Sequence, residues 1–197
     1  MAQQNVAKNG YSVVAHRADV CTTQTVRRIA AMLDQDPDSV AKGAPLPRGW
    51  HFFLLAGATQ RSKLREDGFP GFGVPMPELG LPRLLLGGRT VDFHEDLAVG
   101  QEVDIASCIL SLDHKSGPSG PRAVMKLQHV IAAQGSSSAA LIETQTYVLL
   151  PEERLPPVDF QKVAVAAGSM SISVTPDETS LFQDSAIGFK SNKLDID

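Results

Sequence analysis

The residue types best suited to binding and chemistry lie in the middle of the chain, around a pair of glycines. Gly87 and Gly88 precede Arg89, whose guanidinium can bind a phosphate or a carboxylate through two parallel hydrogen bonds. Paired glycines also let a backbone approach a ligand closely. The alternative is a surface arginine at the start of a strand, and Arg83 is a further candidate for the same binding role.

Histidine is the usual residue for acid-base work near neutral pH. His94, in the run VDFHEDL, has either this role or that of a hydrogen-bonded structural histidine. His51 lies among aromatic residues and is typical of packing. The remaining histidines, His16, His114 and His129, lack the spacing of metal ligands. The sequence therefore predicts no metal site and no cofactor.

The elements that must position these residues are a helix, a long loop and a set of strands. Threonines precede a run in which Val26, Ile29, Ala30 and Leu33 recur at helical spacing, which predicts a helix over about 23–35. Glycine and proline are frequent over 43–82, so this segment is expected to be a long ordered loop.

Strand-like alternation follows the loop. Four strands are expected, at 89–94, 101–113, 121–133 and 139–150. The Gly/Ser-rich connections at 116–120 and 134–138 predict antiparallel hairpins. After a break at 151–157, the sequence indicates a short strand at 169–174 and a second helix capped by Thr175, with Pro176 in its first turn.

Composition limits the class of protein. The 197 residues suit one core, the mean hydropathy is −0.05 and the net charge is −4, and no basic run interleaved with aromatics points to nucleic acid. The N-terminus lacks the pattern of a secretory signal, and no segment approaches the ~20 apolar residues of a membrane span. Cys21 and Cys108 suggest neither a disulfide framework nor a metal site, so a cytoplasmic protein without a membrane partner is expected.

Several runs carry a resemblance to a known family. They are LPRGWHFF at 46–53, the stretch from DGFP to GQEV at 67–103, the turn KSGPSG, and ETQTYVLLPEE at 143–153, with PRLLLGGRTVDFH at 82–94 the most specific. Together they resemble the N-terminal half of the MaoC-like hydroxyacyl-thioester dehydratases, over about residues 20–153. The most similar subgroup contains mesaconyl-CoA and itaconyl-CoA hydratases and the mitochondrial type 2 dehydratase.

The resemblance implies an α+β hot-dog fold, in which an antiparallel sheet wraps around a central helix. Complete members contain two hot dogs, the first shaping the acyl-binding surface and the second carrying the chemistry. On this pattern residues 1–153 form the N-terminal hot-dog domain, and 154–197 form a linker and the incomplete start of a second unit. A dimer is expected, because an open sheet edge invites pairing. In such a domain Trp50 lines an acyl pocket or belongs to the core.

The resemblance also marks where catalytic residues are expected. Relatives carry a phenylalanine-asparagine pair, two histidines and a final aspartate in the segment that matches 181–197. This chain has Lys190 at the asparagine position, Asn192 and Asp195 at the histidine positions, and Asp197 at the aspartate. An asparagine cannot transfer a proton as an imidazole does, and an aspartate needs burial to donate one at neutral pH. The predicted catalytic positions are thus Asp195, Asn192 and Asp197.

The sequence therefore leads to two functional hypotheses. The first is an enoyl-CoA hydratase or hydroxyacyl-thioester dehydratase, a hydro-lyase with a degenerate catalytic motif. It would bind an acyl-CoA or acyl-carrier-protein thioester as the substrate-binding part of an assembly, either a homodimer or a heteromer with a catalytic hot-dog subunit. The second is a non-catalytic acyl-CoA-binding or regulatory hot-dog protein, in which the pocket survives without the chemistry.

Overall fold

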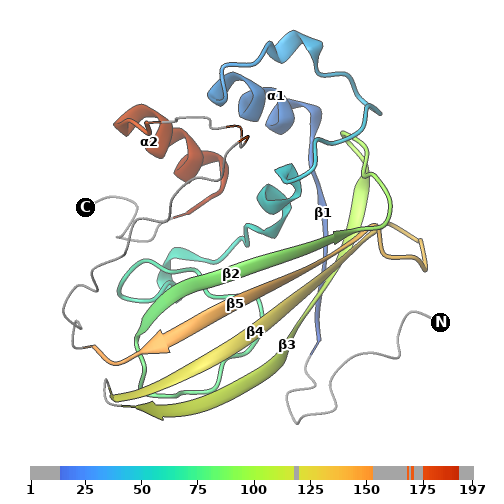
Figure 1. Cartoon of the computed structure of the whole chain (residues 1–197). Coiled ribbons are helices and arrows are strands. Elements are labelled where there is room, and N and C mark those ends of the chain that lie inside the picture. The colour runs from blue at the N-terminus through green and yellow to red at the C-terminus, as the bar shows by residue number, and fades with distance from the viewer. Residues whose placement is uncertain (1–13, 118–119, 153–167, 169, 171–174, 191–197) are drawn as a thin grey trace.

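The computed structural model describes residues 14–117, 120–152, 168, 170 and 175–190, and a five-stranded antiparallel sheet dominates it (Figure 1). The strand order is β1-β3-β4-β5-β2. The strands are β1 (Ala15–Val20), β2 (Arg83–Phe93), β3 (Glu102–Gly117), β4 (Gly120–Ala133) and β5 (Leu141–Leu150). This order makes β1 and β2 the two edges.

The predicted hairpins are confirmed. β3 pairs with β4 and β4 with β5, each antiparallel, through the two predicted connections. The prediction was incomplete at both edges, because it contained no β1 and began β2 at residue 89, six residues after its actual start at Arg83. Along β1 the half-buried positions include Arg17 and Asp19, so hydrophobic alternation is lost there.

Helix α1 (Thr23–Met32) confirms the predicted helix and ends three residues earlier than expected. Thr22 caps its N-terminus, where its side chain accepts a hydrogen bond from the Thr25 amide at 3.1 Å. The helix ends because Leu33 and Asp34 leave the helical conformation, Asp34 with φ of 57°. Its buried face packs through Val26 into the apolar cluster at the end of the sheet where β3 begins.

The middle of the sheet is covered by a further element that the sequence did not suggest. This is the 3₁₀-helix η2 (Trp50–Leu55), which begins after Gly49 at a φ of 95°, a value that glycine adopts without strain. Helix α1 and η2 both contribute to the apolar cluster, through Val26 and Leu54, and η2 with the following loop also lines the cavity over the polar band. Pro47 before η2 and Gly57 after it keep this element short.

Two apolar clusters fill the inner face of the sheet, with a polar band between them. One cluster lies at the end that α1 covers and includes Val103, Ile131 and Leu141; the other contains Met125 and Leu149. Between them the strands place buried polar residues: Ser107, His129, Glu143 and Gln145. Buried polar groups are costly without partners, so this band is where a site is expected.

Helix α2 (Glu178–Ile187) confirms the second helix signal, and it contacts α1. Its N-cap is Asp177 and not Thr175, because the Asp177 carboxylate accepts the hydrogen bond from the Ser180 amide at 2.7 Å. The predicted strand at 169–174, apart from Met170, lies outside the described residues. Within the described ranges, no helix has both the length and the apolar character that crossing a bilayer requires.

Candidate functional site

A cavity of about 450 Å³ lies over the polar band, between the sheet and the segment formed by η2 and the loop after it. Its polar walls come from every strand of the sheet: Arg17, Arg89, Ser107, His129, Gln145 and Tyr147. Its apolar walls include Phe52, Leu55, Phe69 and Phe72. Apolar walls with a few convergent polar groups are typical of a small-molecule site.

The carboxylate of Glu143 organises the polar band from beneath the cavity. It is fully buried, and it accepts hydrogen bonds from His51 Nε2 at 2.6 Å, Arg89 Nε at 2.8 Å and Gln145 Nε2 at 2.6 Å. Burial raises the pKa of this carboxyl group, but the hydrogen bonds and the Arg89 charge outweigh burial, so the net pKa is lowered. Glu143 is therefore an ionised anchor that fixes its three donors.

The hydrogen-bond network continues to the cavity wall along β5. The hydroxyl of Tyr147 donates to Oε1 of Gln145 at 2.6 Å. Burial is the main reason that the pKa of Tyr147 rises to about 12, so this phenol stays a neutral donor. Glu143, Gln145 and Tyr147 alternate along one face of the strand, which aligns them in a row.

Arg89 reaches the cavity because β2 contains a β-bulge. The register places Leu86 opposite Tyr147 and Gly88 opposite Thr146, so Gly87 is the extra residue. Without this bulge, Gly88 would lie opposite Gln145 and Arg89 would lie on the other face of the sheet. The two glycines therefore aim Arg89 at Gln145 and Glu143, and they are not themselves among the residues that line the cavity.

Ser107 and His129 form a second polar pair in the cavity wall. They lie opposite each other on β3 and β4, with 2.7 Å between Ser107 Oγ and His129 Nδ1, and each is 6% exposed. Burial is the largest cause that lowers the pKa of His129 to about 4, and Arg17 and Arg89 also lower it, while Glu143 and a hydrogen bond with Gln145 oppose this. The imidazole is therefore neutral at physiological pH and can accept the serine proton.

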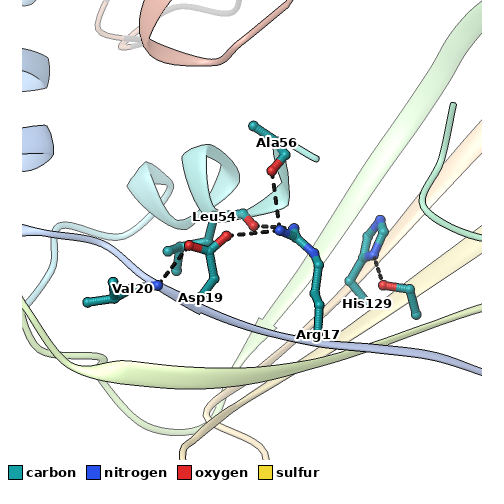
Figure 2. A network of polar contacts seen from close by, with 7 residues as sticks. Arg17, Asp19, Val20, Leu54, Ala56 and His129 are labelled. Carbon is teal, nitrogen blue, oxygen red and sulfur yellow. Dashed lines mark hydrogen bonds and ion pairs between the residues drawn. The ribbon is translucent and has the colours of Figure 1, made fainter. Parts of the chain in front are cut away.

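Arg17 ties η2 to the sheet, as Figure 2 shows. Its guanidinium donates to the carbonyl oxygens of Leu54 and Ala56, the latter at 3.2 Å, and pairs with the Asp19 carboxylate at 2.9 Å. The same figure places Arg17 beside His129. One side chain thus holds the covering segment and contributes positive charge near the imidazole.

The segment after α2 closes one side of the cavity. Gly188, Phe189 and Lys190 are among its lining residues. The Lys190 ammonium lies 2.7 Å from an Asp184 oxygen and 5.7 Å from the centre of the Phe52 ring. Lys190 thus connects the C-terminal segment to η2 across the mouth of the site.

A second hollow of about 680 Å³ adjoins the first under the Gly/Pro-rich loop. The two share Phe69, Gly71 and Phe72, and the second is otherwise lined mainly by apolar residues such as Leu84 and Leu149. Phe69 and Phe72 therefore form a wall common to the polar cavity and this hollow.

The structure brings only part of the predicted binding set together. Arg89 lines the cavity, and Gly87 and Gly88 orient it. Trp50 packs partly buried against the apolar cluster that α1 covers. Arg83 begins β2 and His94 is exposed beyond its end, where its amide donates to the Ala140 carbonyl.

None of Trp50, Arg83 and His94 is among the lining residues of the 450 Å³ cavity. Their substrate-binding role stays a prediction. The three predicted catalytic positions, Asn192, Asp195 and Asp197, lie outside the described residues.

Sequence reasoning missed the centre of the site. Glu143 and Gln145 share a strand face with Leu141 and Leu149, so a charged residue on an apolar face was the available signal. His129 was considered only as a metal ligand. In the part of the chain that the structure describes, no three His, Cys, Asp or Glu side chains are grouped as metal ligands, and the two cysteines are buried free thiols.

Comparison with known families supports the resemblance found in the sequence. The family model described as hydroxyacyl-thioester dehydratase type 2 matches residues 49–195, which is most of the chain. The chain belongs to this family. The match begins just before η2, runs through the polar band and Lys190, and includes two of the three predicted catalytic positions, Asn192 and Asp195.

Among individual relatives, mesaconyl-C(4)-CoA hydratase of Chloroflexus aurantiacus is 29% identical over 184 residues, which cover 91% of this chain and 63% of that protein. The chain thus spans less than two thirds of this curated relative. The solved structure of a MaoC-like dehydratase aligns with a TM-score of 0.59 and 11% identity, over 98% of this chain and 69% of the other. HtdX from Mycobacterium tuberculosis aligns with a TM-score of 0.51 and 14% identity, over 91% and 65%. These likenesses establish the hot-dog fold.

Proposed function

We propose that this chain binds the acyl part of an acyl thioester in the 450 Å³ cavity and contributes that site to reversible hydration of an enoyl thioester. The observation that carries the proposal is the cavity itself, which combines apolar walls with Arg89, Ser107, His129 and Tyr147. The family consists of hydroxyacyl-thioester dehydratases, and mesaconyl-C(4)-CoA hydratase is a hydratase by name. A thioester has both an apolar chain and polar oxygens, so it suits these walls.

Two parts of the site bind the substrate, a polar one at Arg89 and an apolar one in the adjoining hollow. Arg89 has its Nε on the buried Glu143 carboxylate and its side chain is 37% exposed, so the guanidinium is fixed in direction and still accessible to a thioester oxygen or a substrate carboxylate. The apolar hollow that shares Phe69 and Phe72 with the cavity accommodates the rest of a longer acyl chain.

We infer that the chain acts within an assembly, as a homodimer or with a catalytic hot-dog subunit. Two features support this. The sequence has Asn192 and Asp195 at the two positions where the family resemblance predicts histidines. The edge strand β2 is eleven residues long and exposes Leu85 and Leu86 by 46% and 53%, and an edge of this kind is prone to pair with another chain.

Two measurements test the proposal, calorimetric titration with crotonyl-CoA and its hydration followed by loss of enoyl absorbance. We expect Arg89→Met to weaken binding by about tenfold to a hundredfold, since a charge-assisted hydrogen bond contributes ~1.5–3 kcal/mol. The matched control, Arg122→Met, changes an exposed arginine on β4 and should leave the affinity unchanged. Equal affinities of the two variants would overturn the assignment of the cavity.

Hydration is then measured with the chain alone and with a catalytic hot-dog subunit, alongside the native mass. Hydration by the pair but by neither chain alone supports the assembly. Hydration by the chain alone that Asp195→Asn abolishes would replace the heteromer with a complete site in this chain. Binding without hydration in either arm would favour the non-catalytic acyl-CoA-binding protein.

A further inference from the structure

The Ser107–His129 pair has the geometry of a nucleophile with its base, and the hydration chemistry proposed above does not use it. The serine hydroxyl and the imidazole Nδ1 are 2.7 Å apart on neighbouring strands, and both residues line the cavity (Figure 2 shows His129 with this contact). A hydroxyl is a weak nucleophile on its own and becomes effective when an adjacent base takes its proton.

A third side chain lies near the imidazole. Gln145 raises the pKa of His129 against the effect of burial, and Gln145 is itself fixed between the Glu143 carboxylate and the Tyr147 hydroxyl. In the tautomer that can act as a base, Nδ1 accepts the Ser107 hydroxyl and the proton is on Nε2. A nucleophile beside a base, with a further side chain near that base, is the arrangement found in nucleophilic sites.

Cationic side chains line the cavity that contains Ser107 and His129. Arg89 and Lys190 are among its lining residues, and Arg17 lies beside His129. Cationic groups stabilise an oxygen that becomes negative during acyl transfer. Arg89 pairs with Glu143 and Lys190 with Asp184, but their side chains are 37% and 42% exposed, so their remaining N–H groups can donate to a bound oxygen.

We propose that Ser107 is a nucleophile and His129 its general base, which gives the chain a second activity, hydrolysis of the acyl thioester. Ser107 Oγ bonds to the thioester carbonyl carbon while its proton passes to His129 Nδ1. The carbon–sulfur bond then breaks, and the proton leaves with the thiol. Water attacks the resulting serine ester, His129 takes a proton from that water and returns it to Ser107 Oγ, and the free acid departs.

The inference rests on the proposed function only in that the cavity must hold an acyl thioester. The two activities are separated by the substrate: butyryl-CoA has no carbon–carbon double bond to hydrate, so thiol release from it reports the serine alone. Hydration of crotonyl-CoA without thiol release from butyryl-CoA would overturn this inference and leave the proposed function intact. Thiol release from butyryl-CoA without hydration of crotonyl-CoA, even beside a catalytic hot-dog subunit, would do the reverse.

The experiment follows thiol release from butyryl-CoA with a thiol-reactive dye, for the full chain against a buffer blank. We expect release above the blank, with loss of ~10²–10⁴-fold in His129→Gln, the usual contribution of a general base, and loss to the blank in Ser107→Ala. Ser111→Ala is the matched control, since Ser111 lies on β3 outside the cavity lining, and it should release thiol as the unaltered chain does. Unaltered release by Ser107→Ala, or none by the unaltered chain, refutes the nucleophile.

Two further readouts exclude a purely structural role. Ser107→Cys retains a nucleophile, so mass spectrometry should find a butyryl adduct on the peptide with residue 107 even if Ser107→Ala fails to fold; an adduct elsewhere contradicts the proposal. The charged groups that face His129 are Glu143 on β5, Arg17 on β1 and Arg89 on β2. With these charged groups in place, the rate of thiol release, corrected for the blank, should be flat from pH 8 to about pH 5.5 and fall only towards pH 4. A fall centred near pH 6.5 would show instead that the base is another, solvated histidine.

Discussion

Acidification should destabilise this fold in a pH window that His129 defines. The ordinary pKa of 6.5 applies in the unfolded chain, whereas burial lowers it to about 4 in the folded one. Between these values the unfolded chain binds a proton that the folded chain does not, so the free energy of unfolding falls as the pH falls. The full separation corresponds to about 3 kcal/mol, of which about 2 kcal/mol is lost between pH 7 and about pH 4.5.

Urea unfolding at a series of pH values measures this loss, with the single tryptophan, Trp50, as the fluorescent probe. His129→Gln should flatten the dependence above about pH 4.5, because the imidazole that takes up a proton on unfolding is then absent. The control His114→Gln changes an exposed histidine on β3 and should retain the slope.

Protonation of Glu143 does not account for the loss of stability expected between pH 7 and about pH 4.5. Its folded pKa is lowered from 4.5, so its contribution to stability is fully present well above that value and is lost only as the pH falls towards the lowered pKa. If the unaltered chain and His129→Gln lose stability equally between pH 7 and pH 4.5, then His129 is not kept neutral by burial and the reasoning fails.

Two other predictions concern the network around the band. Glu143→Ala removes the carboxylate that three buried or half-buried donors share and should lower the free energy of unfolding by ~3–5 kcal/mol. The control Glu102→Ala changes an exposed carboxylate and should cost less than ~0.5 kcal/mol. A loss below ~1 kcal/mol for Glu143→Ala in urea unfolding would contradict the anchoring role. Arg17→Ala frees the carbonyls of Leu54 and Ala56 and should cost ~1.5–3 kcal/mol, with faster amide exchange along η2 by mass spectrometry, whereas unchanged exchange would show that other contacts hold η2.

The strands and helices that could be predicted from the sequence are those in which apolar residues recur at a regular spacing. Of the predicted α1 stripe, Val26, Ile29 and Ala30 are buried as the spacing required, whereas Leu33 lies at the C-cap and is exposed. The Gly/Ser connections set the hairpins. β1 was missed because its half-buried side carries Arg17, which donates to the carbonyls of Leu54 and Ala56, and Asp19, which pairs with Arg17. Hydrophobic alternation reports apolar burial, so a strand that faces a polar site is invisible to it.

The residues that form the site depend on the register between neighbouring strands, and that register could not be predicted from the sequence. Arg89 was found from its glycine neighbours, but its inward direction depends on a one-residue bulge. Ser107 and His129 are 22 positions apart, and His51 and Glu143 are 92 apart. Ser107 and His129 meet because the β3–β4 hairpin sets them opposite one another, and a slip of one position would turn each to the other face. His51 meets Glu143 because η2 packs over β5.

The pKa values of Glu143 and His129 are both lowered, but the effect on charge is opposite for the two groups, and this difference separates their roles in the site. A lowered pKa keeps Glu143 charged, because donors on three sides compensate its burial. A lowered pKa keeps His129 uncharged, because burial and the two arginines disfavour a further cation there. The carboxylate already accepts hydrogen bonds from three donors, whereas Nδ1 of the imidazole contacts only the Ser107 hydroxyl. The proposed proton exchange with a bound molecule is therefore assigned to Ser107 and His129, and Glu143 should act by holding Arg89 and Gln145 in place.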